Sequence, residues 1–520
     1  MSILNRNHGF ALLAGAACVL GFAPFGIFIV PVLALAALFA LLQRADTPRA
    51  AAGLGFFFGL GLFGAGISWI YVALHDYGDM PMLLAVAATL LFAAFLALFP
   101  ALAGYAQARF LMMNTVPNGM RTVLVMPVFW VLVEWLRGTI FTGFPWLTLG
   151  YAHSDSPLAG YAPLLGVYGV SLVAALSAGL LARLFGTRLR KSGGVILAML
   201  AVLWIGGELL RSVTWTQPHG EPFSVALVQG NIAQHLKFKQ DALAGTLETY
   251  RRLALQNNAR LTVLPETALP LQRHNVPLYL VEQLREHARR NGGDMLIGSF
   301  ERDQDGYYNS VFTLGSADEQ HYRKQHLVPF GEFIPLRPVL GWFINGVLDI
   351  PMSDLARGDK RQAPLNVAGQ RVAVNICYED VFGEEIIRAL PEATLLVNVT
   401  NDAWYGHSHA AAQHNQIAQM RALETGRMML RATNTGVTSI IGADGKVLQQ
   451  LPQHEEAVLL GMAQGYDGAT PYVRWGNAAV MLLISAMLAY AWARRNSSHG
   501  SPPDNGAGGL GRPGGVGVGS

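Results

Sequence analysis

Val372-Ala-Val-Asn-Ile-Cys-Tyr-Glu379 is a run of strand-forming residues that ends at a thiol followed by acids. The chain has only two cysteines, and the other, Cys18, lies in an apolar N-terminal segment typical of a membrane span, so a disulfide between them is not expected. A free cysteine is most often a small buried hydrophobe. A thiol at the carboxyl end of a strand, however, lies where α/β folds place their chemistry, and Cys377 is therefore a candidate nucleophile.

The composition is that of a membrane protein. Of the 520 residues, 52% are hydrophobic and only 14% are charged, whereas a soluble domain has about 25% charged residues. The formal net charge of +3 gives no reason to expect nucleic acid as a partner. The positions of the basic residues are more informative than their sum.

Eight apolar segments are candidates for membrane-spanning helices. A helix that crosses the hydrocarbon core needs about 20 residues, and several segments are that long. The segments are 9–25, 27–43, 54–74, 82–107, 122–137, 164–186, 193–211 and 477–493. The first could also be a cleaved signal peptide, but a second spanning segment follows it at once. We therefore predict a membrane domain with seven transmembrane helices over 1–211, a separate domain over 212–475 and an eighth transmembrane helix over 476–496.

The basic residues predict the orientation of these segments. With a cytoplasmic N-terminus, the turn near residue 25 and the outward segment 75–81 hold no lysine or arginine, and the third outward loop holds only Arg137. This asymmetry satisfies the positive-inside rule. Seven crossings then place residues 212–475 outside the cytoplasm and both termini inside. The Ser-, Gly- and Pro-rich tail, 497–520, is expected to be a disordered cytoplasmic extension.

Residues 212–475 have the pattern of a layered α/β domain. Charged residues return there, and apolar runs of strand length alternate with polar helical patterns. The runs are 224–229, 261–264, 295–298, 310–314, 371–376 and 395–399, and the helical patterns between them include 241–258, 277–291 and 411–430. Helices packed on sheets are the arrangement that this alternation favours.

Two further stretches add ionisable groups. The run 261–266 again ends in a carboxylate, Glu266, and a turn over 322–332 holds Lys324 and Glu332. Each signal alone is weak, because a glutamate after a strand often neighbours a helix start and a single lysine is usually solvated. Together, in the order Glu, Lys, Cys within one domain, they resemble the nitrilase, or carbon–nitrogen hydrolase, superfamily.

The resemblance extends over nearly the whole chain except the tail. Four stretches are similar to those of bacterial apolipoprotein N-acyltransferases, namely Tyr322 to Glu332 (YRKQHLVPFGE), Ile376 to Glu379 (ICYE), Asn398 to Gly406 (NVTNDAWYG) and Arg421 to Arg427 (RALETGR). In the membrane part, Gly21 to Phe25, Ser68-Trp69 and Gly143 to Trp146 also resemble that family. The resemblance implies a nitrilase-like αββα sandwich for the extracytoplasmic domain.

The same resemblance implies a two-step acyl transfer at the outer face of the bacterial inner membrane. A phospholipid would give its acyl chain to the thiol of Cys377, and the α-amine of a diacylglyceryl-cysteine on an apolipoprotein would then accept it. Glu266 would be the general base, because a thiol is a poor nucleophile until it is deprotonated. Lys324 would stabilise the oxyanion, together with the backbone N–H of Tyr378. No cofactor is expected.

Several residues are expected in supporting roles. Glu332 and Glu379 would orient Lys324 and the site, and Tyr378 would help to bind substrate. Trp404 and Tyr405 would line an acyl or lipid pocket, although interfacial anchoring is an alternative for them. The apolar loop 337–352, which includes Trp342 and Phe343, is expected to be a mobile lid on the bilayer surface or, alternatively, a loop packed permanently on its own domain.

Other ionisable residues have simpler interpretations. His407, His409 and His414 have a spacing that could suggest a metal site, but no cysteine lies nearby, and we expect loop and helix-start residues and no metal. Glu134 and Arg137 lie at the end of a span, where charged residues are often functional, and a contact with lipid headgroups is one possibility.

Two other classes of function compete with acyl transfer. A membrane-tethered amidase would use the same glutamate, lysine and cysteine but would give the acyl group to water, and eight spans are excessive for a soluble amide. A transporter or scaffold would need ionisable residues in several spans, and the sequence has few of them.

Overall fold

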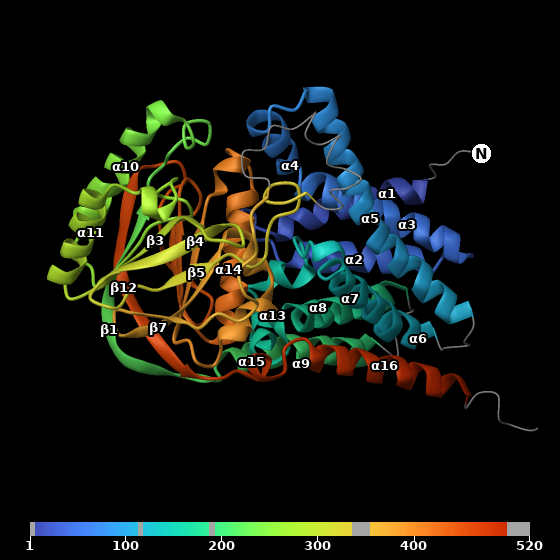
Figure 1. Cartoon of the computed structure of the whole chain (residues 1–520). Helices are drawn as coiled ribbons and strands as arrows, with labels where there is room; N and C mark the ends of the chain where they lie inside the picture. Colours follow the sequence, from blue (N-terminus) through green and yellow to red (C-terminus); the bar gives the residue numbers. More distant parts are fainter. Residues whose placement is uncertain (1–5, 113–117, 187–192, 335–353, 497–520) are drawn as a thin grey trace, which may run out of the picture.

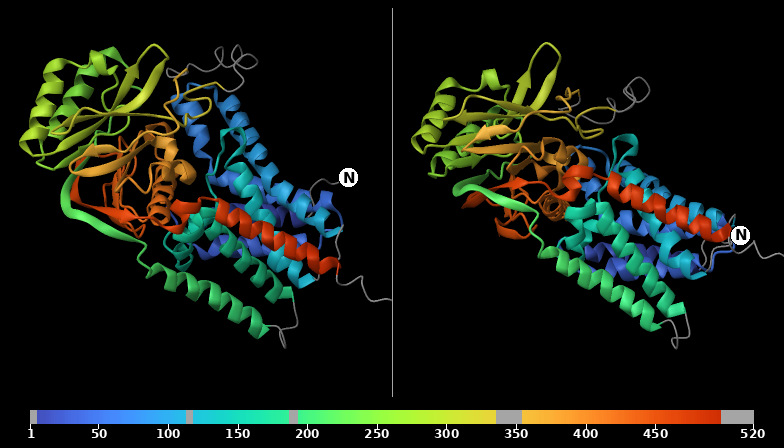
Figure 2. Two further views of the ribbon diagram at one scale, coloured as in Figure 1. Left: turned by 60° about the horizontal axis from the view of Figure 1, so that its bottom comes forward. Right: turned by 90° about the horizontal axis from the view of Figure 1, so that it is seen from below.

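The computed structural model describes residues 6–112, 118–186, 193–334 and 354–496 (Figure 1). A bundle of helices, built from the N-terminal part of the chain and the last helix, lies beside an α/β domain that contains all the strands (Figures 1 and 2). The expected lid, with Trp342 and Phe343, and the expected disordered tail lie outside the described residues.

Each of the eight apolar segments contains a helix. The helices are α1 (Arg6–Cys18), α2 (Ile29–Leu42), α3 (Pro48–Gly66), α5 (Met82–Met112), α7 (Met126–Arg137), α8 (Ala162–Gly186), α9 (Gly193–Arg211) and α16 (Ala478–Asn496), with the short α4 (Trp69–Val72) and α6 (Asn118–Met120) between them. In the described part of the chain, four helices are long and apolar enough to cross a membrane, and those over Ile29–Leu42 and Ala478–Arg494 are shorter apolar helices.

The bounds of α3 correct the segment expected over 54–74. The helix begins at Pro48, six residues earlier, and ends at Gly66. Thr47 caps its N-terminus by accepting a hydrogen bond from the backbone N–H of Ala50, and Pro48 occupies the first helical position. Capping and proline therefore set this boundary, and hydropathy alone does not.

The α/β domain contains two six-stranded sheets. The first has the order β12-β1-β2-β3-β4-β5 and the second β11-β10-β9-β8-β7-β6. The strands are β1 (Thr216–Gln229), β2 (Leu261–Val263), β3 (Asp294–Arg302), β4 (Tyr307–Gly315), β5 (His321–Arg323), β6 (Leu365–Val367), β7 (Gln370–Ile376), β8 (Leu395–Thr400), β9 (Met429–Thr433), β10 (Ser439–Ile441), β11 (Val447–Gln450) and β12 (Ala457–Gly468). Three consecutive strands of each sheet are parallel, β1-β2-β3 and β7-β8-β9, so their carboxyl ends share one edge.

The layers of this domain follow from which faces are apolar. Residues such as Val225, Val374 and Val397 fill the space between the sheets. Helices α10 (Gln240–Leu255) and α11 (Leu278–Arg290) pack on the first sheet, and α13 (Gly383–Ile386) and α14 (Ala410–Thr425) pack on the second. The order helix, sheet, sheet, helix confirms the expected αββα sandwich.

Helix α14 lies between the second sheet and the bundle. All of its residues except Ala412 are buried, although many are polar. Gln413 Oε1 accepts hydrogen bonds from the indole N–H groups of Trp69 and Trp146 at 3.2 and 2.7 Å. Glu424 Oε1 accepts one from the backbone N–H of Val167 at 2.7 Å. The helix therefore joins the two parts of the molecule through paired polar groups.

The helical pattern expected over 411–430 extends too far. Helix α14 ends at Thr425, because Gly426 adopts a left-handed conformation with φ +62° and its N–H closes the last turn on Ala422. Met429–Thr433 then forms β9 between β8 and β10. Strands β5, β6, β10 and β11, which have only three or four residues each, and the long strand β12 were not predicted from the sequence. The pattern over 241–258 similarly ends early, at Leu255.

Candidate active site

Cys377 lies at the point where β7 ends, as the sequence analysis predicted. Its backbone adopts a left-handed conformation, with φ +54°, which is uncommon outside glycine and clusters at functional sites. The residue opens a tight turn, Cys377–Val381, and its carbonyl oxygen accepts a hydrogen bond of 3.2 Å from Asn398 Nδ2 on β8. The main chain of Cys377 is therefore held by the neighbouring strand in a left-handed conformation that a cysteine rarely adopts.

Glu266 and Lys324 come from the first sheet, whereas Cys377 comes from the second. Glu266 follows β2 by three residues, and Lys324 directly follows β5. The Lys324 Nζ lies 3.4 Å from Glu266 Oε1 and 2.8 Å from Glu332 Oε1, and all three side chains are buried. Both Glu266 and Lys324 are close enough to Cys377 to influence its thiol electrostatically. The fold thus brings the expected glutamate, lysine and cysteine to one buried place.

The carboxylate of Glu266 is fixed by three donors. Its Oε1 accepts hydrogen bonds from Asn309 Nδ2 at 2.7 Å and from Lys324 Nζ at 3.4 Å. Its Oε2 accepts one from the backbone N–H of Asn401 at 2.9 Å. A carboxylate has about four lone-pair positions, so these contacts leave one of them, on Oε2, to take a proton.

Burial and charge set the protonation of the thiol and the lysine. Burial, reinforced by Glu266, raises the pKa of the Cys377 thiol above its usual range, although Lys324 opposes the shift. Burial alone would lower the pKa of Lys324, but Glu332 and Glu266 more than offset it and hold that pKa well above its usual range. Lys324 is therefore a permanent cation at neutral pH, and the resting thiol is protonated and needs a base.

Lys237 is a second buried lysine at the site. Its Nζ donates a hydrogen bond of 3.0 Å to the main-chain oxygen of Glu266. Burial lowers the pKa of Lys237 to about 8, and the charges of Glu266 and Cys377 only partly oppose this shift. Lys237, Asn309 and Asn401 were not predicted as site residues, because single polar residues of these types are usually on the surface.

Glu379 connects the ends of strands from the two sheets. Its Oε2 accepts hydrogen bonds from the backbone N–H of Ile376 at 2.7 Å and from the Tyr322 hydroxyl at 3.0 Å. Its Oε1 accepts from the backbone N–H groups of Gln325 and His326 at 2.7 and 3.0 Å. Tyr322 precedes Lys324 in sequence and Gln325 follows it, so Glu379 positions the lysine by holding the segment that carries it. Glu332, in contrast, accepts a hydrogen bond from the lysine itself.

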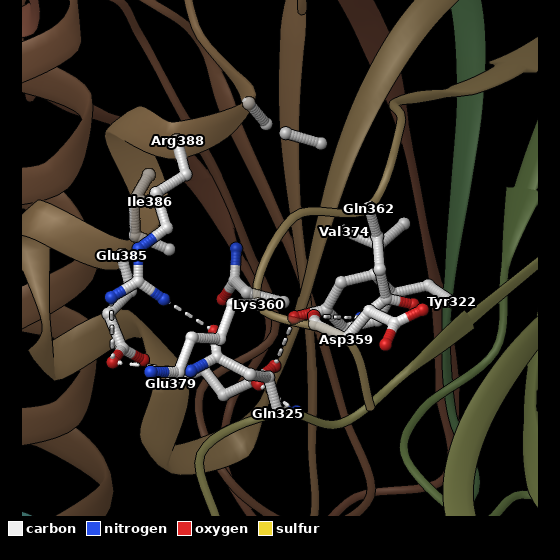
Figure 3. Close-up of a pocket in the computed structure, with 13 residues that line it drawn as sticks. Tyr322, Gln325, Asp359, Lys360, Gln362, Val374, Glu379, Glu385, Ile386 and Arg388 are labelled. Carbon is white, nitrogen blue, oxygen red and sulfur yellow. Dashed lines mark hydrogen bonds and ion pairs between the residues drawn. The ribbon is translucent and has the colours of Figure 1, made fainter. Parts of the chain in front are cut away.

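Glu379 also lines a cavity, together with Tyr322, Gln325, Lys360 and Arg388 (Figure 3). Neither Cys377 nor Glu266 lines this cavity. Most of the polar groups around it bind one another, as Arg388 Nη1 binds Gln325 Oε1 at 2.7 Å. The cavity therefore adjoins Glu379, which positions Lys324, and it does not contain the reacting groups.

We expect Glu379→Gln to destabilise the protein by about 3 kcal/mol, because the amide nitrogen would face at least one backbone N–H, which only donates, whichever way the side chain is turned. Denaturant unfolding of the detergent-solubilised protein measures this change. The matched control is Glu385→Gln, whose side chain is 18% exposed and for which a loss of about 1 kcal/mol or less is expected. Equal losses for the two variants would contradict the role of Glu379.

Tyr378 points toward the bundle. Its hydroxyl donates a hydrogen bond of 3.0 Å to the carbonyl oxygen of Gly143, so the residue after the thiol is tied to the loop over 143–146. Tyr405 also contacts the bundle, with its ring centroid 4.7 Å from that of Trp69. Trp404 lies beside it in the turn Asp402–Tyr405 and is partly exposed. These three aromatic residues thus lie where the α/β domain meets the membrane part.

Glu134 and Arg137 are engaged inside the protein, which does not favour the suggested contact with lipid headgroups. Arg137 Nη1 donates to the carbonyl oxygen of Trp146 at 2.6 Å, and Nη2 donates to Thr148 Oγ1 at 3.2 Å. Glu134 Oε1 accepts from the backbone N–H of Leu149 at 2.8 Å. The pair therefore fixes the loop that touches Tyr378.

The three histidines lie in different settings. The ring of His407 lies 3.9 Å from that of His454, between centroids. His409 precedes α14 as its N-cap residue, as expected of a helix start. His414 lies within the helix, buried, with Asp380 and Asp402 on its two ring nitrogens. His407 and His409 thus lie in a turn and at a helix start, and His414 makes two buried polar contacts.

Comparisons with known proteins agree with this division into two parts. The family described as apolipoprotein N-acyltransferase N-terminal domain matches residues 14–180, and the carbon–nitrogen hydrolase family matches residues 224–466. An apolipoprotein N-acyltransferase of Nitrosomonas europaea is 53% identical over 490 residues, which cover 93% of this chain and 97% of the relative. One of Chromobacterium violaceum is 45% identical and covers 93% of this chain and 94% of the relative.

Among solved structures, the carbon–nitrogen hydrolase superfamily protein XC1258 of Xanthomonas campestris is similar to part of this chain. The match covers 52% of this chain and 97% of that protein, with a TM-score of 0.37 and 20% identity.

Proposed function

This chain belongs to the family of apolipoprotein N-acyltransferases, and from this premise we propose how its residues carry out the transfer. The enzyme moves an acyl group to an apolipoprotein, and its carbon–nitrogen hydrolase domain is catalytic. We assign the chemistry to Cys377, Glu266 and Lys324. The observation that supports this assignment is the buried contact of Lys324 with Glu266 beside a thiol that is held in a strained turn.

In the first step, Glu266 takes the thiol proton on the free position of Oε2 while the sulfur of Cys377 attacks the ester carbonyl of a phospholipid. Lys324 and the backbone N–H of Tyr378 stabilise the oxyanion. When the tetrahedral intermediate collapses, the carbon–oxygen bond breaks and Glu266 gives its proton to the departing lysophospholipid oxygen. The acyl chain remains on Cys377 as a thioester.

In the second step, the α-amine of a diacylglyceryl-cysteine attacks the thioester. Glu266 accepts a proton from the amine, the carbon–sulfur bond breaks, and the sulfur of Cys377 regains a proton from Glu266. A thioester reacts with amines more readily than an oxygen ester does, so amide formation needs no nucleotide to activate the fatty acid. Water must be kept from the thioester while it waits, and the buried setting of Cys377 supports this requirement.

The partition of the acyl group between amine and water tests this proposal against the amidase alternative. Purified enzyme is loaded from phospholipid and then mixed with a lipopeptide that begins with diacylglyceryl-cysteine. We expect one acyl chain per enzyme to persist without the lipopeptide and to move to its amine when it is added. Steady release of free fatty acid with no loaded enzyme would instead support the amidase.

We also propose that the bundle crosses the bacterial inner membrane eight times and holds the α/β domain on the periplasmic side. The described start of α1 and end of α16 lie at the end of the bundle remote from the α/β domain (Figure 2). Arg121 Nη2 donates to the carbonyl oxygen of Leu42, the last residue of α2, at 3.1 Å. Its charge therefore lies near the α2–α3 connection, which carries Arg44 and leads into Arg49 at the start of α3, as expected of a cytoplasmic end.

Reporter fusions test this orientation. Alkaline phosphatase fused near residue 360 should be active, because it would be exported with the α/β domain, and the same reporter fused after residue 497 should be inactive. The reverse pattern would overturn the proposed topology. A cytoplasmic reporter such as a β-galactosidase at the same two positions provides the control, with the opposite activities expected.

A further inference from the structure

His414 is held between two aspartates in the interior of the protein. Its Nε2 lies 2.8 Å from Asp380 Oδ1, and its Nδ1 lies 2.9 Å from Asp402 Oδ1. Arg431 of β9 closes the arrangement, with Nη1 2.9 Å from Asp380 Oδ2 and Nη2 3.1 Å from Asp402 Oδ2. No side chain of the four is more than 2% exposed. Two acids and two bases thus form a closed ring.

The contacts define the protonation state of His414. Ionised aspartates only accept hydrogen bonds, so a histidine with one on each ring nitrogen carries both protons and a positive charge. Burial and Arg431 would lower the pKa of His414, but Asp380 and Asp402 more than offset them and raise it. With His414 charged, the four residues have two positive and two negative groups. Their charges therefore compensate one another in an interior from which water is excluded.

The two aspartates belong to the two halves of the catalytic site. Asp380 lies in the same tight turn as Cys377, three residues after the thiol. Asp402 directly follows Asn401, whose backbone N–H holds Glu266 Oε2 at 2.9 Å. His414 therefore bridges the turn that carries the nucleophile and the segment that holds the base.

Arg431 adds a second connection to the nucleophile. Its Nη1 donates to Asn398 Oδ1 at 2.7 Å, and Asn398 Nδ2 donates to the carbonyl oxygen of Cys377 at 3.2 Å. His414 also lies against the bundle, with its ring centroid 5.4 Å from that of Trp146. The four-residue arrangement thus contacts the second sheet through Asn398 and the membrane part through Trp146.

We propose that His414 is a positioning residue for acyl transfer. Its charged imidazole, held between Asp380 and Asp402, fixes the separation between the thiol of Cys377 and its base, Glu266. This inference rests on the proposed function, because it assumes that Glu266 deprotonates Cys377. Misplacing a reacting group by about 1 Å can cost about 100-fold in rate, even when the change lies away from the chemistry. Loss of the bridge should therefore slow loading of the thiol without preventing the fold or the binding of lipid.

The inference has a defined pH dependence. The pKa of His414 is raised in the folded protein, so its stabilising contribution is complete below about 6.5, the ordinary value for histidine, and is lost as pH rises through the folded value. Above that value a neutral imidazole would turn a lone pair toward Asp380 or Asp402. Loading of the wild type should therefore acquire an alkaline decline that a variant without the imidazole lacks.

The test is to measure the rate and the final extent of acyl loading separately, with full-length enzyme, phospholipid and intact-mass detection. His414→Gln should load to the wild-type extent but about 100-fold more slowly, with its KM for phospholipid changed less than about threefold, and without the alkaline decline. Asp402→Asn, which removes one side of the bridge, should slow loading at least about tenfold at full extent. His287→Gln, a half-buried histidine of α11 with its own hydrogen bond to Asn257, should load as the wild type does.

Three results would decide against the inference. Loading of His414→Gln at the wild-type rate would show that the bridge does not position the thiol. A reduced extent at an unchanged rate, in both His414→Gln and Asp402→Asn, would show that the ring only supports folding. An alkaline decline retained in His414→Gln would assign that decline to another group. Failure of the wild type itself to load would instead refute the proposed function.

Discussion

Cys377→Ser is expected to acquire no acyl mass that hydroxylamine removes, whereas the wild type incubated with phospholipid gains one acyl chain that hydroxylamine releases. A serine hydroxyl is a far weaker nucleophile than a thiol with the same base, and an ester formed on it would resist neutral hydroxylamine. Removal of a nucleophile from a catalytic group of this kind costs on the order of 10⁴-fold or more in rate. Intact-mass spectrometry without the acceptor measures the loaded fraction directly.

The chain contains its own control for this experiment. Cys18 is the only other cysteine, and it is buried at the end of α1 in the bundle. Cys18→Ser should load like the wild type, because that thiol has no part in the proposed chemistry. A hydroxylamine-sensitive mass that appears on Cys377→Ser and disappears in Cys18→Ser would contradict the assignment of the nucleophile.

Glu266→Gln should slow loading by about 10²- to 10⁴-fold, the range that a general base contributes. Its pH dependence identifies the cause. Burial, the largest cause of the raised pKa of the Cys377 thiol, remains in this variant, whereas the contribution of Glu266 to that pKa is lost. Below the pKa of the thiol, hydroxide would have to replace the lost base, so the rate of Glu266→Gln should rise about tenfold for each pH unit.

Lys324→Met provides the comparison, because it removes the oxyanion's partner and retains the base. It should slow loading by about 10²- to 10³-fold, and alkaline pH should not restore its rate. A Glu266→Gln rate that does not depend on pH, or a Lys324→Met rate that high pH restores, would mean that the proposed roles are wrong. Lys446→Met, in an exposed pair with Asp444, should leave loading unchanged.

Cys377 and Glu266 could be predicted from the sequence because each follows an apolar run that forms a strand, whereas Lys324 follows the short polar strand His321–Arg323 and was found through the family resemblance. Cys377 directly follows β7, Lys324 directly follows β5, and Glu266 lies just beyond β2. Parallel strands place their carboxyl ends at one edge of a sheet, but β2 and β7 belong to different sheets, so the common site followed from the family resemblance. The sandwich itself followed from the same alternation of strands and helices together with the family resemblance.

The groups that hold the site could not be predicted in this way. Asn309 lies inside β4, and Asn401 follows β8 within the stretch Asn398 to Gly406 that resembles the family, but neither residue has a local pattern that predicts a contact with Glu266. His414 was expected only as a loop or helix-start residue, and its burial could not be predicted, because α14 is polar over much of its length and polar helices usually face water. The helix is buried because protein covers both of its sides, which is a property of the whole fold and is invisible to any single window of sequence.

The position of α14 has a consequence for the independence of the two parts. In a fragment cut at residue 212, Gln413 and Glu424 would lose Trp69, Trp146 and the N–H of Val167, and the apolar residues Ile417 and Met420 would meet water. A helix shared in this way cannot serve as the outer wall of a soluble enzyme. The membrane bundle is thus a structural wall of the catalytic domain as well as its anchor, and gene fusions or truncations that separate the two would deliver an incomplete fold.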